Sequence, residues 1–162
     1  MLGIATLVAA AAMLLQSPDF PAGGAIPSAL MAADCGGRNR TPALAWSNVP
    51  PSVKSFALVE RDPDAPVTGG FYHWVVYDIP ASTRSLGGGS PAHGRTGLAS
   101  TGKAAYYGPC PPPGPAHHYV FTLYALDFAH AGGGGPLTGQ QLEARLRGHV
   151  LAHAILEGTA AH

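Results

Sequence analysis

Three nearly continuous apolar runs limit what this chain can fold into. They read SFALVER at 55–61, YHWVVYDI at 72–79 and HYVFTLYAL at 118–126. Val, Tyr, Phe and Trp are frequent in them, as they are in β-strands. A strand with one face in water would alternate apolar and polar residues, so we expect these strands to be covered on both faces. The pattern predicts the central strands of a β-sandwich.

One helix is predicted, over 139–151. Thr138 and Gln141 have the spacing of a capping box, in which each side chain satisfies a backbone N–H of the first turn. Apolar residues then recur every four residues from Leu142 to Val150, which gives one apolar stripe. A single helix after a series of strands favours a mostly β, antiparallel sandwich with one or two peripheral helices.

The composition excludes several classes of protein. The chain has 162 residues, of which 46% are hydrophobic and 11% charged, so it can fold as one domain with its own core. Its formal net charge is zero with the histidines neutral, and no basic stripe is visible, so we expect no nucleic-acid partner. A small anion could still bind, but only through a local site and not through the field of the whole protein.

The first residues allow two interpretations. Residues 2–15 read LGIATLVAAAAMLL, which is too short for a stable membrane span. They resemble the apolar region of a secretory signal, with Ala10 and Ala12 at an A-x-A cleavage site, although no positive charge precedes them. Residues 1–15 are therefore predicted to be either a signal peptide or a buried first strand, ahead of a single domain at 16–162. A signal would make the protein periplasmic or secreted; the alternative location is cytoplasmic.

Polar residues follow the first apolar run in a loop that two prolines stiffen. The segment DPDAP at 62–66 comes directly after that run, and His73 and Trp74 stand at the start of the second run. Two carboxylates and an imidazole are therefore held at one end of the sheet. The prolines fix φ, so the aspartates lose little entropy on binding. An ordinary turn is the plain alternative, since Asp and Pro are common turn residues.

A second loop is rich in proline and leads into the third apolar run. It reads GPCPPPG at 108–114, and His117, His118 and Tyr119 follow. Proline has no N–H to donate to a sheet, so this segment is predicted to be a rigid loop. Alternate residues of a strand share a face, so His117 and Tyr119 would point the same way and His118 the opposite way. The pair offers two donors to one ligand, although a rim histidine beside a packed tyrosine would give the same pattern.

These two segments resemble a known family. DPDAP followed by HW, and GPCPPPG followed by HHY, are similar to the two signature motifs of the phosphatidylethanolamine-binding protein family, and most of all to its bacterial, Raf-kinase-inhibitor-like branch. Further similarities are SPDF at 17–20, CGGRN at 35–39, PALAW at 42–46 and LYALD at 123–127. The resemblance covers residues 16–158, which is nearly the whole chain.

The resemblance implies a Greek-key β-sandwich with one small pocket. The implied function is that of a small-ligand binding protein for phosphate, acetate or a phosphoryl headgroup, which could also regulate a protein partner. The pocket residues carried over by motif position are Asp62, His73, Pro111, His117 and Tyr119. The residues implied for the supporting loops are Asp64, Pro66, Trp74, Gly108, Cys110 and Pro112. The resemblance implies no cofactor and no metal.

Two further expectations depend on the family. Its members usually carry Arg where this chain has His118, which is predicted to face away from the pocket, so we expect the loss of a structural ion pair and not of binding. The family also places the loops of Cys35 and Cys110 near one another. The two cysteines could therefore pair in an exported protein and would stay reduced in the cytosol. Two cysteines alone fit no zinc-finger spacing.

An anion beside Asp62 poses an electrostatic problem, because like charges ~4 Å apart repel by several kcal/mol at an effective dielectric constant near 20. We expect Asp62 to pair with His73 or His117 and to keep that imidazole protonated near neutral pH, since a neighbouring carboxylate raises the pKa of a histidine. Backbone N–H groups near Gly108 and the Tyr119 hydroxyl would add neutral donors.

Three other functions fit the same residues. Asp62, His73 and His117 could hold a metal ion, and His149 and His153 would lie one turn apart on the predicted helix, but no H-E-x-x-H motif supports a metal site. A histidine beside an aspartate could serve a weak hydrolase, yet no G-x-S-x-G elbow or activated nucleophile is visible, so we expect no enzyme. A protease or kinase inhibitor is suggested by the family name alone, and fold does not fix function.

Overall fold

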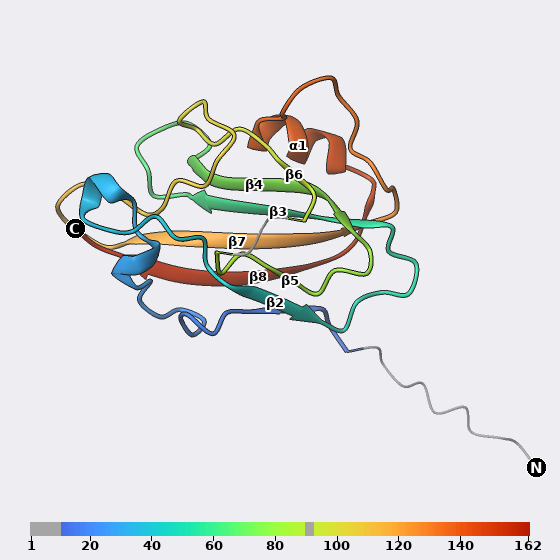
Figure 1. Ribbon diagram of the computed structural model, residues 1–162, viewed down its shortest axis with the longest axis horizontal. Helices are drawn as coiled ribbons and strands as arrows, with labels where there is room; N and C mark the ends of the chain where they lie inside the picture. Colours follow the sequence, from blue (N-terminus) through green and yellow to red (C-terminus); the bar gives the residue numbers. More distant parts are fainter. Residues whose placement is uncertain (1–10, 90–92) are drawn as a thin grey trace, which may run out of the picture.

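The computed structural model describes residues 11–89 and 93–162, which form two antiparallel sheets and one helix (Figure 1). The smaller sheet has the strand order β1 (Leu14–Gln16), β2 (Leu44–Ser47) and β5 (Ser85–Leu86). The larger sheet has the order β6 (Arg95–Thr96), β4 (Phe71–Pro80), β3 (Ser55–Asp62), β7 (His117–Leu126) and β8 (Val150–Ala160). The predicted mostly β sandwich is confirmed, and the three apolar runs are its central strands.

The central strands are covered on both faces, as their sequences predict. Phe56 and Leu58 of β3 point into a core between the two sheets. Ala57 and Val59 follow Phe56 and Leu58 in the strand and point to the opposite face. They lie in a second core, which packs against the helix α1 (Gly139–Leu146). Strands with one core on each face need apolar residues at every position, which explains the continuous runs.

The helix is shorter than predicted. The capping box is present, with Thr138 Oγ1 accepting from the Gln141 N–H at 3.2 Å and Gln141 Oε1 accepting from the Thr138 N–H at 3.0 Å. The helix nevertheless ends at Leu146, because Gly148 takes a φ of +81° and turns the chain into β8. Val150 therefore belongs to a strand, and the prediction of a helix to residue 151 was wrong.

Because the helix ends at Leu146, His149 and His153 do not share the helical face on which they were expected. His149 lies in the turn before β8, where its Nδ1 is 2.9 Å from Asp127 Oδ1, and His153 lies on β8 itself. Within residues 11–89 and 93–162 no group of three His, Cys, Asp or Glu side chains could hold a metal ion. The helical metal pair suggested by the sequence spacing is therefore not formed.

The N-terminal segment contributes to the smaller sheet. Of the predicted signal peptide or first strand at 1–15, residues 1–10 lie outside the described part of the chain. Leu14 and Leu15 begin β1 and pair with Ser47 and Trp46 of β2, and Leu15 is buried between the sheets. In the described segments, no helix has both the length and the apolar character needed to cross a membrane.

Two 3-10 helices complete the fold, η1 (Ser28–Leu30) and η2 (Ala33–Cys35). They lie at the end of the sandwich where β3 ends and β7 begins, and Figure 1 shows them beside the C-terminus. Tyr106 Oη donates to the Leu30 carbonyl at 2.8 Å, and the Asn39 side chain donates to the Tyr106 carbonyl at 3.2 Å. These contacts tie the segment before the second loop to the end of the sandwich.

Candidate functional site

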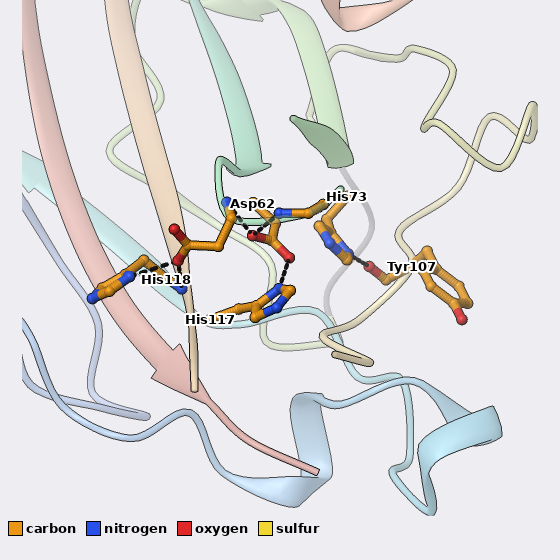
Figure 2. A network of polar contacts seen from close by, with 7 residues as sticks. Asp62, His73, Tyr107, His117 and His118 are labelled. Atoms are coloured by element: carbon orange, nitrogen blue, oxygen red, sulfur yellow. Dashed lines mark hydrogen bonds and ion pairs between the residues drawn. The ribbon is translucent and has the colours of Figure 1, made fainter. Parts of the chain in front are cut away.

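Asp62 is the last residue of β3, and three donors fix its carboxylate (Figure 2). Its Oδ1 accepts from the N–H groups of Asp64 at 2.8 Å and Ala65 at 3.1 Å, which is the Asx-turn that Asp favours. Its Oδ2 lies 2.7 Å from Nδ1 of His117. The ordinary turn, which was the other interpretation of this loop, is therefore present. It orients a carboxylate that also contacts His117 at the start of the strand β7 (His117–Leu126).

His73 reaches the site because it is the extra residue of a β-bulge. Glu60 pairs with Trp74 and Arg61 with Tyr72, which leaves His73 without a partner residue on β3. A bulge lets two successive side chains share a face and is a common way to redirect a side chain next to a site. His73 consequently packs edge-on against Tyr119, with ring centroids 5.1 Å apart.

The hydrogen bond of His73 fixes its tautomer. Its Nδ1 is 2.6 Å from the Tyr107 carbonyl oxygen, and a carbonyl can only accept, so Nδ1 carries the proton. The ring is buried, and burial lowers the pKa of His73, although the Tyr107 carbonyl and Asp62 act in the opposite direction. His73 is therefore neutral at pH 7, and its Nε2 is an acceptor. Of the two partners expected for Asp62, His73 and His117, the structure pairs the carboxylate with His117.

His117 and Tyr119 begin β7 and share a face, as the alternation predicts. His117 uses Nδ1 for Asp62, which leaves Nε2 for a ligand. Tyr119 is fully buried, and within the described segments its hydroxyl has no hydrogen-bond partner of acceptable geometry. Burial, followed by the Asp62 and Glu60 carboxyls, raises the pKa of Tyr119, while the nearby Cys110 N–H acts weakly in the other direction.

These side chains line one cavity of about 380 Å³ at the end of the sandwich. All five predicted pocket residues lie in its wall, together with Pro66, Cys110 and Pro112, which had been expected only in supporting loops. Five further residues contribute that the sequence reasoning did not identify: Ala65, Val67, Phe71, Thr101 and Tyr107. Phe71 and Tyr107 flank His73, with ring centroids 4.7 Å and 6.0 Å from it. Phe71 and Tyr107 each lie next to a predicted motif in the sequence, and this position is the signal that could have identified them.

Three predicted supporting residues lie outside the cavity wall. Trp74 packs edge-on against Tyr106 at 5.5 Å, between the sheets. Gly108 allows close backbone packing, because a Cβ at this position would lie 2.1 Å from the Leu30 carbonyl oxygen. Its N–H donates to Asn39 Oδ1 at 2.8 Å, so among the N–H groups around Gly108 and Cys110 that were expected as donors for an anion, that of Gly108 is already engaged.

Asp64, the third of these residues, forms an ion pair with His118 away from the cavity (Figure 2). Asp64 Oδ2 accepts from the His118 N–H at 2.8 Å and lies 2.6 Å from Nδ1 of the same residue. Hydrogen bonds from His118 lower the pKa of Asp64, and the bond to Asp64 raises the pKa of His118. The loss of an ion pair expected at this position is therefore not seen, because His118 pairs with Asp64 when its ring is protonated.

A disulfide joins the second loop to η2. Cys110 is bonded to Cys35, with Cα atoms 5.5 Å apart and a sequence separation of 75 residues. Cys110 also lines the cavity, between Gly108 and the prolines at 111 and 112. The disulfide therefore anchors one wall of the cavity to the end of the sandwich.

Comparisons with known proteins agree with this fold. A family model described as phosphatidylethanolamine-binding protein matches residues 16–161. UPF0098 protein YbhB of Escherichia coli is 38% identical over 152 residues, which are 88% of this chain and 96% of YbhB. LppC of Mycobacterium tuberculosis, named as a candidate lipoprotein, is 44% identical over 124 residues, which are 75% of this chain and 59% of LppC.

A solved structure of another protein has the same fold. The crystal structure of Escherichia coli YbcL, described as a new member of the mammalian PEBP family, aligns with a TM-score of 0.86 at 30% identity. The alignment covers 94% of this chain and 99% of that one. Sequence and structure agree over nearly the whole length, and the chain belongs to the phosphatidylethanolamine-binding protein family.

Proposed function

We propose that this protein binds a small oxyanion, such as phosphate or a phosphoryl headgroup, in the cavity at the end of the sandwich. The Asp62–His117 hydrogen bond of 2.7 Å is the observation that carries the proposal. With Nδ1 engaged by Asp62, His117 turns its other ring nitrogen, Nε2, toward the cavity, where a protonated imidazole donates to an oxyanion. The Tyr119 hydroxyl, which has no partner within the described segments, supplies a second donor.

The negative charge of Asp62 does not oppose this function, because its oxygens are already engaged. Oδ1 accepts two backbone N–H groups and Oδ2 faces His117. A carboxylate compensated in this way acts on the ligand mainly through the imidazole that it orients. We expect affinity in the high-micromolar to millimolar range, or roughly 4–6 kcal/mol, because a small ligand offers few atoms.

The first prediction tests the role of Asp62 by calorimetric titration with inorganic phosphate at pH 7 and pH 5. Asp62→Asn should weaken binding at both pH values, because His117 loses the carboxylate that orients its ring. His117→Ala should weaken binding about tenfold or more at both pH values, because a charge-assisted hydrogen bond is lost. Tighter binding by Asp62→Asn at pH 7 would show that Asp62 merely repels the anion.

The second prediction concerns the choice of anion. The neutral His73 offers an acceptor at Nε2, so the best ligand carries a hydroxyl proton as well as acceptor oxygens. Phosphate has such a proton at pH 6–7 and sulfate, which has the same shape, has none. We expect phosphate to bind at least about tenfold more tightly than sulfate, because sulfate would leave one buried acceptor facing another. Equal affinities in parallel titrations would contradict the assigned tautomer.

We propose a binding protein and not an enzyme. The one thiol near the cavity, that of Cys110, is held in the disulfide and is not available as a nucleophile. The Asp62–His117 pair alone resembles a general base, but the cavity wall contains no serine beside it. Membership of the family is compatible with a role as a regulator of a protein partner. The residues of the cavity do not point to such a partner.

We also propose that the protein is exported. The apolar segment 2–15, the disulfide and the naming of the relative LppC as a candidate lipoprotein all support an oxidising, extracytoplasmic location. Fractionation of cells that express the full chain, with the thiols alkylated on lysis, tests this proposal. Recovery of the protein in the cytoplasmic fraction with both thiols free would contradict it.

A further inference from the structure

A side chain outside the cavity wall is bonded to that wall from behind. The wall is built from residues between 62 and 119, whereas Asn39 belongs to the turn that follows η2. Its Oδ1 accepts from the Gly108 N–H at 2.8 Å, and its Nδ2 donates to the Tyr106 carbonyl at 3.2 Å. The two bonds flank Tyr107, which lines the cavity. The proposed binding chemistry does not use Asn39, so its contacts call for an explanation of their own.

The two contacts specify an asparagine at this position. A backbone N–H only donates and a carbonyl only accepts, so the side chain between them must offer one acceptor and one donor, as an amide does. Asn39 also has a φ of +51°, in the left-handed region that asparagine enters more readily than most residues. Its own N–H donates to the Met31 carbonyl at 2.8 Å, so the segment between η1 and η2 fixes the position of the amide.

One peptide group connects Asn39 to His73. The carbonyl of Tyr107 and the N–H of Gly108 belong to the same planar peptide unit, and in a trans peptide they point in opposite directions. The N–H donates to Asn39 Oδ1, and the carbonyl accepts from His73 Nδ1 at 2.6 Å (Figure 2). The Tyr107 N–H also donates to the His73 carbonyl at 3.0 Å, which keeps the two residues side by side. The orientation of one peptide plane is therefore fixed by Asn39 on one edge and by His73 on the other.

This peptide plane needs the bond to Asn39, because it ends in a glycine. Gly108 is required for close packing on the Leu30 carbonyl, and glycine leaves the backbone free to rotate. Other bonds hold the neighbouring residues: the Ala32 N–H donates to the Pro109 carbonyl at 3.0 Å, and Tyr106 Oη donates to the Leu30 carbonyl. The bond to Asn39 is the one that engages the N–H of the plane itself.

We propose that Asn39 is a positioning residue that sets which anion the cavity prefers. It holds the peptide group between Tyr107 and Gly108 so that the carbonyl meets His73 Nδ1, and it thereby keeps His73 Nε2 an acceptor for a proton of the ligand. If the carbonyl turned away, Nδ1 would lose its acceptor and the neutral ring could carry its proton on Nε2 instead. The cavity would then present a donor where it now presents an acceptor. The inference rests on the proposed function of the cavity.

Parallel titrations with inorganic phosphate and sulfate at pH 6.5 test this role. Asn39→Gly removes the amide and tolerates the positive φ. It should lower the preference for phosphate over sulfate from at least about tenfold to below about threefold, because His73 Nε2 is no longer held as an acceptor. Asn39→Asp keeps an acceptor for the Gly108 N–H and loses only the donor to Tyr106, so its preference should stay within about twofold of that of the wild type. Thermal denaturation of each variant identifies a temperature at which it is folded for the titrations.

The ratio of the two affinities is a readout that a general loosening of the wall would not move, because loosening weakens both anions alike. Asn48→Gly is the matched control: Asn48 also has a left-handed φ, of +57°, and its Nδ2 donates to the Ala12 carbonyl at 3.1 Å, away from the cavity. Its ratio should equal that of the wild type. An unchanged ratio in Asn39→Gly, or an equal fall in Asn48→Gly or in Asn39→Asp, would overturn the inference.

A nuclear magnetic resonance measurement tests the tautomer without any ligand. Two-bond proton–nitrogen correlation spectra at pH 7 should show His73 protonated at Nδ1 in the wild type and in Asn39→Asp, and partly protonated at Nε2 in Asn39→Gly. Identical His73 signals in the wild type and Asn39→Gly would overturn the inference and leave the proposed function standing. If the wild type binds neither anion, the proposed function fails, and the ring spectra still decide whether Asn39 fixes the tautomer of His73.

Discussion

Replacing both Cys35 and Cys110 by alanine should lower the free energy of unfolding by about 4 kcal/mol. The disulfide links positions 75 residues apart, and closing so long a loop removes much of the conformational entropy of the unfolded chain. Urea denaturation of the wild type and the double variant, followed by circular dichroism, measures the difference. A loss of less than about 1 kcal/mol would indicate that the unfolded chain is restrained by other means.

The same substitution should affect the cavity, because Cys110 forms part of its wall. Without the disulfide, the loop at 108–114 is still held by the Gly108–Asn39 hydrogen bond, by the hydrogen bond from the Ala32 N–H to the Pro109 carbonyl and by its prolines. We expect phosphate binding to weaken in the double variant and to weaken equally when the wild type is reduced. The wild type without reductant is the matched control. Full affinity after complete reduction would show that the loop keeps its position without the bond.

Replacing Asp62 by alanine should cost about 3–5 kcal/mol of stability and should abolish phosphate binding. The substitution removes one ion pair that is nearly buried, with side-chain exposures of 5% for Asp62 and 13% for His117. It also leaves the N–H groups of Asp64 and Ala65 without the acceptor that orders the turn. Thermal and urea denaturation at pH 7 measure the loss.

Asp64→Ala is the matched control for that experiment. Asp64 is also an aspartate of the same loop, and it is also paired with a histidine, but both side chains are largely exposed, at 41% and 50%. Solvent screens such pairs, so the stability loss should be much smaller and phosphate binding should be unchanged. Equal losses for the two variants would mean that burial does not distinguish these ion pairs.

The central fold was predictable because it depends on local patterns. The continuous apolar composition of runs such as SFALVER at 55–61 indicates a central strand that is covered on both faces. The strands β3, β4 and β7 begin and end within one residue of the predicted bounds. The capping box placed the start of the helix for the same reason. Its end depended on Gly148, whose positive φ turns the chain into β8, and the regular spacing of Leu142, Leu146 and Val150 concealed that change.

The sequence by itself placed Asp62, His73, His117 and Tyr119 at the ends of neighbouring strands, where they meet at the cavity, but it did not identify further wall residues such as Phe71 and Tyr107. It could not determine the partner of each group. Whether Asp62 contacts His73 or His117 depends on a β-bulge and on the position of the Tyr107 carbonyl, both of which arise when distant segments pack. The burial of Glu60 likewise exists only after the sheets close over it and exclude water. Residue types and their faces are local properties, whereas hydrogen-bond partners, burial and the resulting protonation states are decided by the tertiary structure.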